Sequence, residues 1–286
     1  MGEKIEPDES YPLRFSLILR FAWATLWGRR RDLPADIAAA LAAVRPSPQV
    51  RNDHHIPAEG PFVLVLNHYE RPGLKVFWAG CLASHAVAQR RARHKAVRWL
   101  MTSEWYSARL GPIPVPVLTW RLLFRRLGRA YGLVIVPRAA ERGVGRAAAI
   151  RTILNIVRHS DEPIGLFPEA VGTGRLIQPP PGLGSFLLVL TSHGLPILPV
   201  GAFEEEGRLT VSFGPPFQID APRNAPRAEK ERLASQQVMV AIGRLLPEQL
   251  WGVYAQAIRE ALQPEACPPD RQAGPSRPEA QDRAPL

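Results

Sequence analysis

The sequence predicts an α/β fold built on a mixed, largely parallel sheet that is flanked by helices. Between residue 50 and about residue 225, five apolar runs of strand length alternate with segments of helical periodicity. This alternation is typical of a sheet covered by helices on both faces. The chain has 286 residues and is 46% hydrophobic, which is enough for a sizeable core.

The N-terminal segment, residues 1–49, has a different composition. Its first ten residues are acidic and polar, so we expect no cleavable signal there. Residues 15–27 are rich in Phe, Leu and Trp and are followed by Arg29, Arg30 and Arg31. Thirteen residues are too few to cross a bilayer comfortably. This amphipathic segment therefore suits either a helix at a membrane interface or a helix packed on the domain.

A short Ala-rich helix over residues 34–44 and a Pro-containing linker lead into the domain at 50–225. Strands are expected at Phe62–Leu66, Leu133–Val136, Ile164–Phe167, Ile197–Val200 and Leu209–Phe213. Helices are expected at Leu74–Arg91, Leu118–Arg129, Arg146–His159 and Ser185–His193. Residues 226–262 read as helices interrupted at Pro247. The tail, 263–286, is rich in Pro and polar residues and is expected to be disordered.

The charge of the chain points to an acidic partner. The net charge is +10, with 32 Arg and only four Lys. Such a balance favours an anionic membrane surface, a phosphorylated substrate or nucleic acid, although the excess of Arg over Lys is equally typical of a GC-rich genome. We find no nucleic-acid-binding motif and expect no nucleic-acid partner. The two cysteines, Cys81 and Cys267, lie in unrelated contexts, which predicts free thiols and a reducing compartment.

Candidate catalytic residues follow the predicted strands. Asn67 and His68 end the first strand, and imidazole is the side chain whose pKa suits proton transfer near neutral pH. Arg138 follows the second strand, and Glu169 follows the third. Because parallel strands gather their carboxyl ends at one edge, we expect His68, Arg138 and Glu169 to converge on a single cleft.

The order and spacing of these blocks resemble the glycerolipid acyltransferase family, whose best-known members acylate lysophosphatidic acid. Asn67-His68 matches the family's Asn-His-x4-Asp block, and Gly132 with Arg138 matches its Gly-x5-Arg strand. Phe167-Pro168-Glu169 matches the Phe-Pro-Glu-Gly block, and Leu195–Val200 matches a Val-Pro-Ile-x-Pro-Val strand. Gly214-Pro-Pro-Phe217 is similar to a segment near the end of the family's domain. The resemblance covers about residues 50–220.

This resemblance implies an acyltransferase-like fold and an acyl transfer reaction. His68 would accept the proton of an acceptor hydroxyl as it attacks the thioester of an acyl-CoA or acyl carrier protein. Arg138 would hold the phosphate of a lysolipid acceptor, and Glu169 would bind its glycerol part or brace the arginine. Asn67, Gly132 and Pro168 are further substrate-binding positions by the same resemblance. No metal and no other cofactor is implied, and a protein of phospholipid metabolism at the cytoplasmic face of a membrane is expected.

Two positions depart from the family pattern. The family's aspartate, which orients the histidine, falls at Gly73, and 170–172 replace the usual Gly-Thr-Arg. Arg175 would restore the missing cation if the preceding turn folds back. Glu70 is the nearest carboxylate that could orient His68. Pairing of Glu70 with Arg71 at a helix start, or a backbone carbonyl as orienter, are the alternatives.

Two other functions remain open from the sequence. A degenerate acyltransferase fold could bind a lipid or a partner without turnover, because Gly73 has no side chain. A metal-dependent hydrolase could use Asp53-His54-His55 together with His68-Tyr69-Glu70. The cysteine pair that a zinc deaminase needs is absent from the sequence.

Overall fold

The structure, a computed structural model, describes residues 11–12, 15–93, 96–102, 109–110, 113–114, 117–136, 142–222 and 224–263. Its helices are α1 (Phe15–Trp27), α2 (Leu33–Leu41), α3 (Phe77–Arg90), α4 (Val117–Tyr131), α5 (Arg142–Ser160), α6 (Leu183–Ser192), α7 (Arg227–Gly243) and α8 (Ala255–Leu262). Short 3-10 helices are η1 (Asp53–His55), η3 (Glu248–Leu250) and η4 (Gly252–Tyr254). Its strands are β1 (Gln49–Arg51), β2 (Val63–Leu66), β3 (Arg98–Thr102), β4 (Arg109–Leu110), β5 (Ile113–Pro114), β6 (Val134–Val136), β7 (Ile164–Leu166), β8 (Ile197–Glu205) and β9 (Arg208–Phe213).

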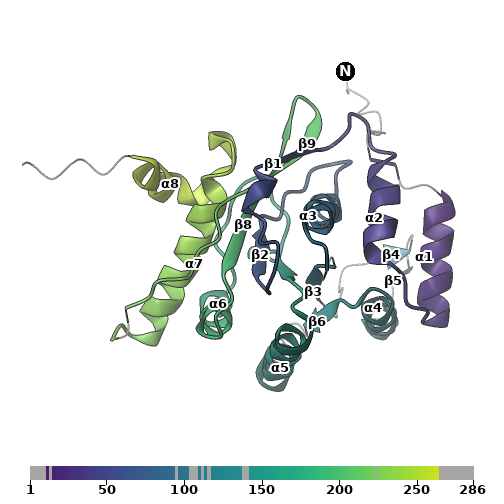
Figure 1. Cartoon of the computed structure of the whole chain (residues 1–286), viewed down its shortest axis with the longest axis horizontal. Helices are drawn as coiled ribbons and strands as arrows, with labels where there is room; N and C mark the ends of the chain where they lie inside the picture. The colour runs from purple at the N-terminus through teal and green to yellow at the C-terminus, as the bar shows by residue number, and fades with distance from the viewer. Residues whose placement is uncertain are drawn as a thin grey trace, which may run out of the picture.

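Seven of these strands form one sheet in the order β1-β9-β8-β2-β7-β3-β6. Every neighbouring pair is parallel except β8 and β9, which form an antiparallel hairpin. Helices lie on both faces of this sheet, with α3 on one side and α6 and α7 on the other (Figure 1). The predicted fold class, a mixed and largely parallel α/β sheet, is confirmed.

The central strand β2 shows why the apolar runs become strands. All four of its residues are buried, as expected for a strand covered on both faces. Leu64 and Leu66 pack into the core that contains α2 and α3, whereas Val63 and Val65 pack into the core that contains α6 and α7. Successive side chains point to opposite faces of a strand, so one apolar run fills two cores.

All five predicted strands are present, with ends shifted by at most one residue except at β8, which continues to Glu205. The helix expected over 15–27 has these bounds. Four strands escaped prediction: β1, β3, β4 and β5. They are short or mix charged and apolar residues, so neither the helical nor the strand period of apolar residues stands out. The predicted interruption at Pro247 falls between α7 and α8, and most of the predicted tail, 264–286, lies outside the described residues.

The N-terminal helices are tied to one another by a charged network. Asp36 of α2 accepts bonds from Arg31 (2.5 Å) and from the Tyr131 hydroxyl of α4 (2.9 Å). The backbone N–H of Arg31 donates to the carbonyl of Ala130 (3.0 Å). Within the described ranges, no helix combines the length and the apolar character that crossing a bilayer requires.

Candidate active site

The carboxyl ends of β2 and β7 bring two of the predicted site residues together. The two strands are parallel neighbours, with Val65 opposite Leu166. The backbone N–H of His68 donates a 2.5 Å hydrogen bond to the carboxylate of Glu169. His68 and Glu169 therefore meet at one edge of the sheet, because parallel strands end on the same side.

Asn67 fixes the end of β2. Its side-chain amide donates to the carbonyl of Ala202 (2.9 Å), and its side-chain oxygen accepts the N–H of the same residue (2.6 Å). Asn67 is buried, and both of its polar groups are used by this contact with β8. The side chain thus holds the backbone from which His68 projects.

Glu169 binds backbone groups on two sides. A turn places it there, since the N–H of Ala170 donates to the carbonyl of Phe167 (3.2 Å) and Pro168 occupies the second turn position, which proline favours. Besides His68, the N–H of Ile177 donates to the Glu169 carboxylate (3.1 Å). Glu169 is only 3% exposed, and this burial raises its pKa to about 7 although the two N–H bonds act in the opposite direction.

The His68 ring is held by a stack of aromatic side chains. It meets Phe167 edge-on, with ring centroids 5.4 Å apart, and Phe167 stacks on Trp99 of β3 at 4.9 Å. The indole N–H of Trp99 donates to the hydroxyl of Ser84 in α3 (2.8 Å). Trp99 was not foreseen from the sequence because its strand was not predicted. Phe167, the first residue of the Phe-Pro-Glu block, was the sequence signal that could have indicated an aromatic contact near His68.

One ring nitrogen of His68 is buried and has no hydrogen-bond partner among the residues that the structure describes. This nitrogen, Nδ1, lies beside Gly172 and Glu70: a Cβ added to Gly172 would lie 2.9 Å from Nδ1 and 2.8 Å from Oε2 of Glu70. Burial lowers the pKa of His68 from its ordinary value, while its own backbone and the charge of Glu70 raise it. The imidazole is therefore neutral at pH 7, the form that can accept a proton.

Glu70 does not pair with Arg71, which was one of the alternatives for its role. The other oxygen of Glu70 accepts a bond from Lys75 (2.7 Å). Arg71 instead binds Glu204 of β8, with its Nη2 2.6 Å from Oε1. Glu70 thus remains beside His68 on the exposed rim of the site.

A tight turn explains the glycine at the position of the family's aspartate. Arg71 and Leu74 exchange both backbone hydrogen bonds (3.1 and 3.0 Å), with Pro72 and Gly73 between them. Gly73 has a φ of 83°, in the left-handed region, and Pro-Gly at these positions is the signature of a type II turn. An aspartate there would strain the backbone. Helix α3 begins only at Phe77, three residues later than predicted.

Of the remaining predicted residues, the structure describes Arg175 and Gly132. Arg175 is exposed and is not among the residues that line the groove described below. Gly132 precedes β6, and its carbonyl accepts a bond from Arg98 (3.1 Å) at the start of β3. Since β3 and β7 start side by side, Gly132 lies at the opposite edge of the sheet from His68. Arg138 lies outside the described residues.

A long apolar groove of about 2010 Å³ passes His68, Phe167, Pro168 and Glu169. Its walls come from α1, α2, α3, α4 and α6 and include Leu17, Ile37, Cys81, Leu127 and Phe186. Burial raises the pKa of the Cys81 thiol to about 12, so this cysteine is a neutral wall residue. The groove is larger than the ~300–1,000 Å³ typical of small-molecule sites, which suits a long apolar ligand.

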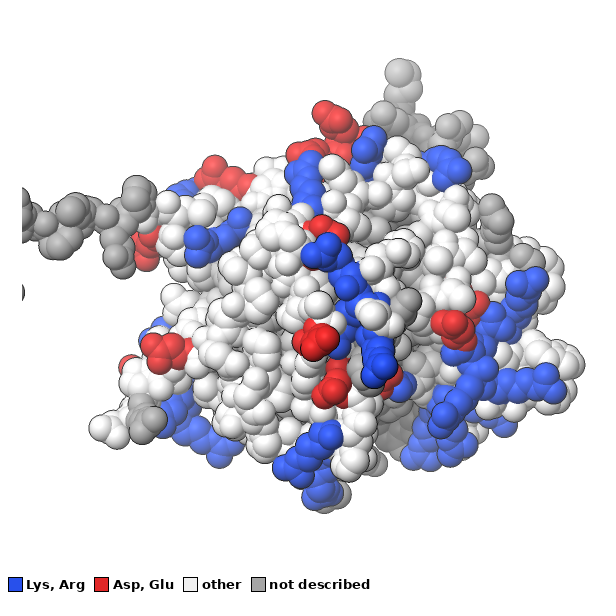
Figure 2. Space-filling view, in the orientation of Figure 1, with Lys and Arg blue, Asp and Glu red and all other residues white. Residues whose placement is uncertain are grey.

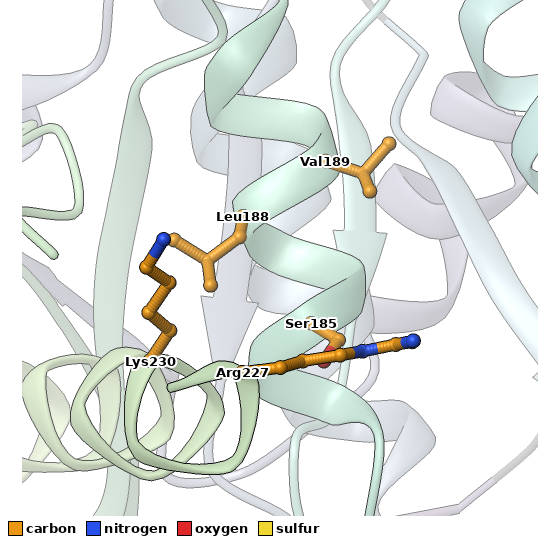
Figure 3. A pocket seen from close by; sticks show the side chains of 5 residues that line it. All are labelled: Ser185, Leu188, Val189, Arg227 and Lys230. Atoms are coloured by element: carbon orange, nitrogen blue, oxygen red, sulfur yellow. The ribbon is translucent and has the colours of Figure 1, made fainter. Parts of the chain in front are cut away.

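A smaller pocket of about 350 Å³ adjoins the groove between α6 and α7 (Figure 3). Ser185, Val189 and Arg227 line both cavities, and Lys230 lines the smaller one. The Ser185 hydroxyl donates to Glu231 (2.8 Å). Polar and charged side chains therefore border this end of an otherwise apolar groove.

The residues considered for a metal site do not form one. Asp53, His54 and His55 make up η1, and the rings of the two histidines contact each other at 4.2 Å. Across the part of the chain that the structure describes, no group of three or more His, Cys, Asp or Glu side chains could hold a metal ion.

Comparisons with known proteins add a structural likeness. No protein-family model matches the sequence, and no curated protein matches it. Among solved structures, the chain is similar to the 1-acyl-sn-glycerophosphate (LPA) acyltransferase PlsC from Thermotoga maritima, with 14% identity and a TM-score of 0.45 over 88% of this chain and 85% of that one. Because identity and TM-score are both low, the function has to be inferred from the residues of this chain.

Proposed function

We propose that the protein is an O-acyltransferase of phospholipid biosynthesis or remodelling. It would move a fatty acyl group from a thioester donor, acyl-CoA or acyl carrier protein, to a hydroxyl of a phosphorylated lysolipid or glycerol acceptor. The observation that carries this proposal is a neutral, half-buried histidine on the wall of a large apolar groove. The order of the sequence blocks around Asn67-His68 and Phe167–Glu169 supports the same reaction.

His68 supplies the proton transfer in this reaction. Its Nδ1 is buried beside Glu70 and Gly172, so Nε2 is the nitrogen left to face the substrate. Nε2 takes the proton of the acceptor hydroxyl while that oxygen attacks the thioester carbonyl carbon. The carbon–sulfur bond then breaks, and the proton passes to the departing sulfur, giving an ester and a free thiol. General base catalysis of this kind is worth roughly 10²–10⁴-fold.

Glu70 is the side chain that we propose to orient His68 in place of the family's aspartate. It is the carboxylate that shares the corner at Gly172 with Nδ1. Asn67 and Glu169 act differently, because their polar groups are occupied by backbone partners. We assign them the positioning of His68, and Pro168 the shape of the groove wall.

The acceptor phosphate needs a cation at the rim of the site. Arg138 has that role by resemblance to the family. Arg175 is a second candidate: it is exposed after the Gly172–Gly174 turn, which runs alongside the chain at Tyr69. No ion pair of Arg175 is found in the described part of the chain. A planar, permanently charged guanidinium suits a phosphate.

The proposed location of the reaction is the cytoplasmic face of an anionic membrane. Helix α1 would lie at the interface between the membrane and water.

Binding without turnover is the second candidate function. It is favoured by Gly73, whose left-handed turn leaves the site without the aspartate of the family. A protein of this kind would still hold an acyl chain in the groove.

An acyl-CoA panel combined with lysolipid acceptors tests the proposal. We expect thiol release and formation of the acylated lipid with at least one pair of substrates. Isothermal titration with the same acyl-CoA and lysolipid set measures binding separately. Binding without thiol release for every pair would overturn the enzymatic proposal and leave the binding function.

A further inference from the structure

Exposed apolar side chains are concentrated on two helices. Among the described residues, thirteen large hydrophobic side chains are exposed, and nine of them belong to α1 or α4: Phe15, Ile18, Leu19, Phe21, Trp23, Trp27, Leu118, Leu122 and Leu123. Scattered exposed hydrophobics are common on soluble proteins, but a contiguous cluster marks an interaction surface.

The two helices form one continuous face. The ring of Phe21 in α1 stacks on Tyr131 in α4 with centroids 5.9 Å apart. The Arg31–Ala130 backbone bond (3.0 Å) joins the chain after α1 to the end of α4. We call the exposed side of this pair, residues 15–31 and 117–131, the α1–α4 face.

The exposed charges of the α1–α4 face have one sign. Its two segments contain no Asp or Glu, and whereas Arg31 is paired with Asp36 of α2, the exposed arginines are Arg20, Arg29, Arg30, Arg125, Arg126 and Arg129. Figure 2 shows basic side chains gathered at the lower right, over the region where Figure 1 places α1 and α4. A face that is both apolar and uniformly basic complements the anionic head groups and the acyl chains of a bilayer.

The order of residues along α4 fits this partner. Leu118, Leu122, Arg125 and Arg129 recur at helical spacing on one side, while Phe124 and Ala130 are buried on the other. Trp23 and Trp27 of α1 stack one turn apart at 4.1 Å, and tryptophan is enriched at membrane–water interfaces.

We propose that α4, together with α1, binds the surface of an anionic bilayer and directs the groove toward it. Both helices also form groove walls, α1 through Ile18 and Phe21 and α4 through Leu127 and Tyr131. An apolar substrate can then pass from the membrane into the groove along these helices. The entry of substrate rests on the proposed acyltransferase function, whereas the binding of the bilayer does not.

Vesicle flotation of the full-length protein tests the proposal without an enzyme assay. We expect binding to phosphatidylcholine vesicles that contain phosphatidylglycerol, and much weaker binding to phosphatidylcholine alone. The double substitution Arg125→Gln and Arg126→Gln should weaken binding about 25-fold, at ~1 kcal/mol per arginine, or roughly fivefold each. Leu118→Ser with Leu122→Ser should weaken it at least about tenfold.

Matched substitutions elsewhere are the controls. Arg151→Gln with Arg158→Gln removes the same charge from exposed positions of α5, and Val253→Ser removes an exposed apolar side chain of η4. These variants should bind vesicles like the unchanged protein, and circular dichroism checks that all variants are folded. Equal binding by the α4 variants, an equal loss in the controls, or no binding of anionic vesicles by the unchanged protein would each overturn the proposal. The last result would leave a protein partner or a second copy of the chain as the occupant.

Discussion

His68 and Glu169 follow neighbouring parallel strands at the same edge of the sheet, yet their surroundings differ. The Glu169 carboxylate accepts two backbone N–H bonds and is 3% exposed. The His68 ring is half-buried and lines the groove, and one of its nitrogens has no hydrogen-bond partner in the described part of the chain. A side chain whose bonds are all made within the fold stabilises it, whereas one with unused capacity is available for a substrate.

This difference separates the residues that position His68 from His68 itself, which is available for proton transfer, although one sequence pattern contains them all. The aromatic stack of Phe167 and Trp99 limits the movement of the His68 ring, and Asn67 and Glu169 hold its backbone. Local rigidity and an unpaired imidazole are therefore combined at one strand end. Substitutions at His68, Glu169 and Glu70 should affect activity and stability in different proportions.

The largest effect is expected for His68→Ala. Loss of the general base should lower the rate of thiol release by roughly 10²–10⁴-fold. Loss of the aromatic contact with Phe167 should lower the free energy of unfolding by only about 0.5–1.5 kcal/mol. Steady-state kinetics and urea unfolding measure the two effects, with His159→Ala on exposed α5 as control. A variant that loses stability but keeps its rate would reverse the assignment.

Glu169→Gln should act mainly on stability. The amide that replaces one carboxylate oxygen cannot accept a hydrogen bond, so one buried backbone N–H loses its acceptor at a cost of about 1–3 kcal/mol. Urea unfolding measures this loss, and Glu206→Gln on the exposed β8–β9 hairpin is the control. An unchanged midpoint would show that the carboxylate does not hold the two loops.

The pH dependence of stability, compared between the unchanged protein and Glu169→Gln, sharpens this prediction. Burial raises the pKa of Glu169 from 4.5 to about 7 in the folded protein, so the folded state binds more protons between these values. The stability contributed by Glu169 is therefore complete below about pH 4.5 and declines as the pH rises to about 7. The stability difference between the unchanged protein and Glu169→Gln should shrink over that window.

The smallest effect is expected for Glu70→Gln. Its charge raises the pKa of His68, so its removal should shift the acidic limb of the pH–rate profile to lower pH. The maximal rate should fall roughly fivefold, the equivalent of about 1 kcal/mol for a partly exposed charge. Lys75→Met removes the cation paired with Glu70 but leaves the Glu70 carboxylate in place, so it should not shift the acidic limb of the pH–rate profile to lower pH. A profile that does not move in Glu70→Gln would leave His68 oriented by its backbone.

The sequence by itself determined five of the seven strands of the main sheet and the residues that end them. Apolar runs such as 62–66 and 164–167 report local periodicity, and the side-chain alternation of a strand needs no knowledge of its neighbours. Given a parallel sheet, the meeting of His68 and Glu169 follows from their positions after these runs. The Pro72-Gly73 turn could have been read from its composition as well.

Only the tertiary structure decided which residues surround His68. The order of strands inserts β3 beside β7, which places Trp99 behind Phe167. The loop after β7 brings Gly172 against Nδ1, and the start of β6 carries Gly132 to the opposite edge. These contacts join residues far apart in the chain, and local propensities carry no information about such pairings because the packing of the whole sheet determines them.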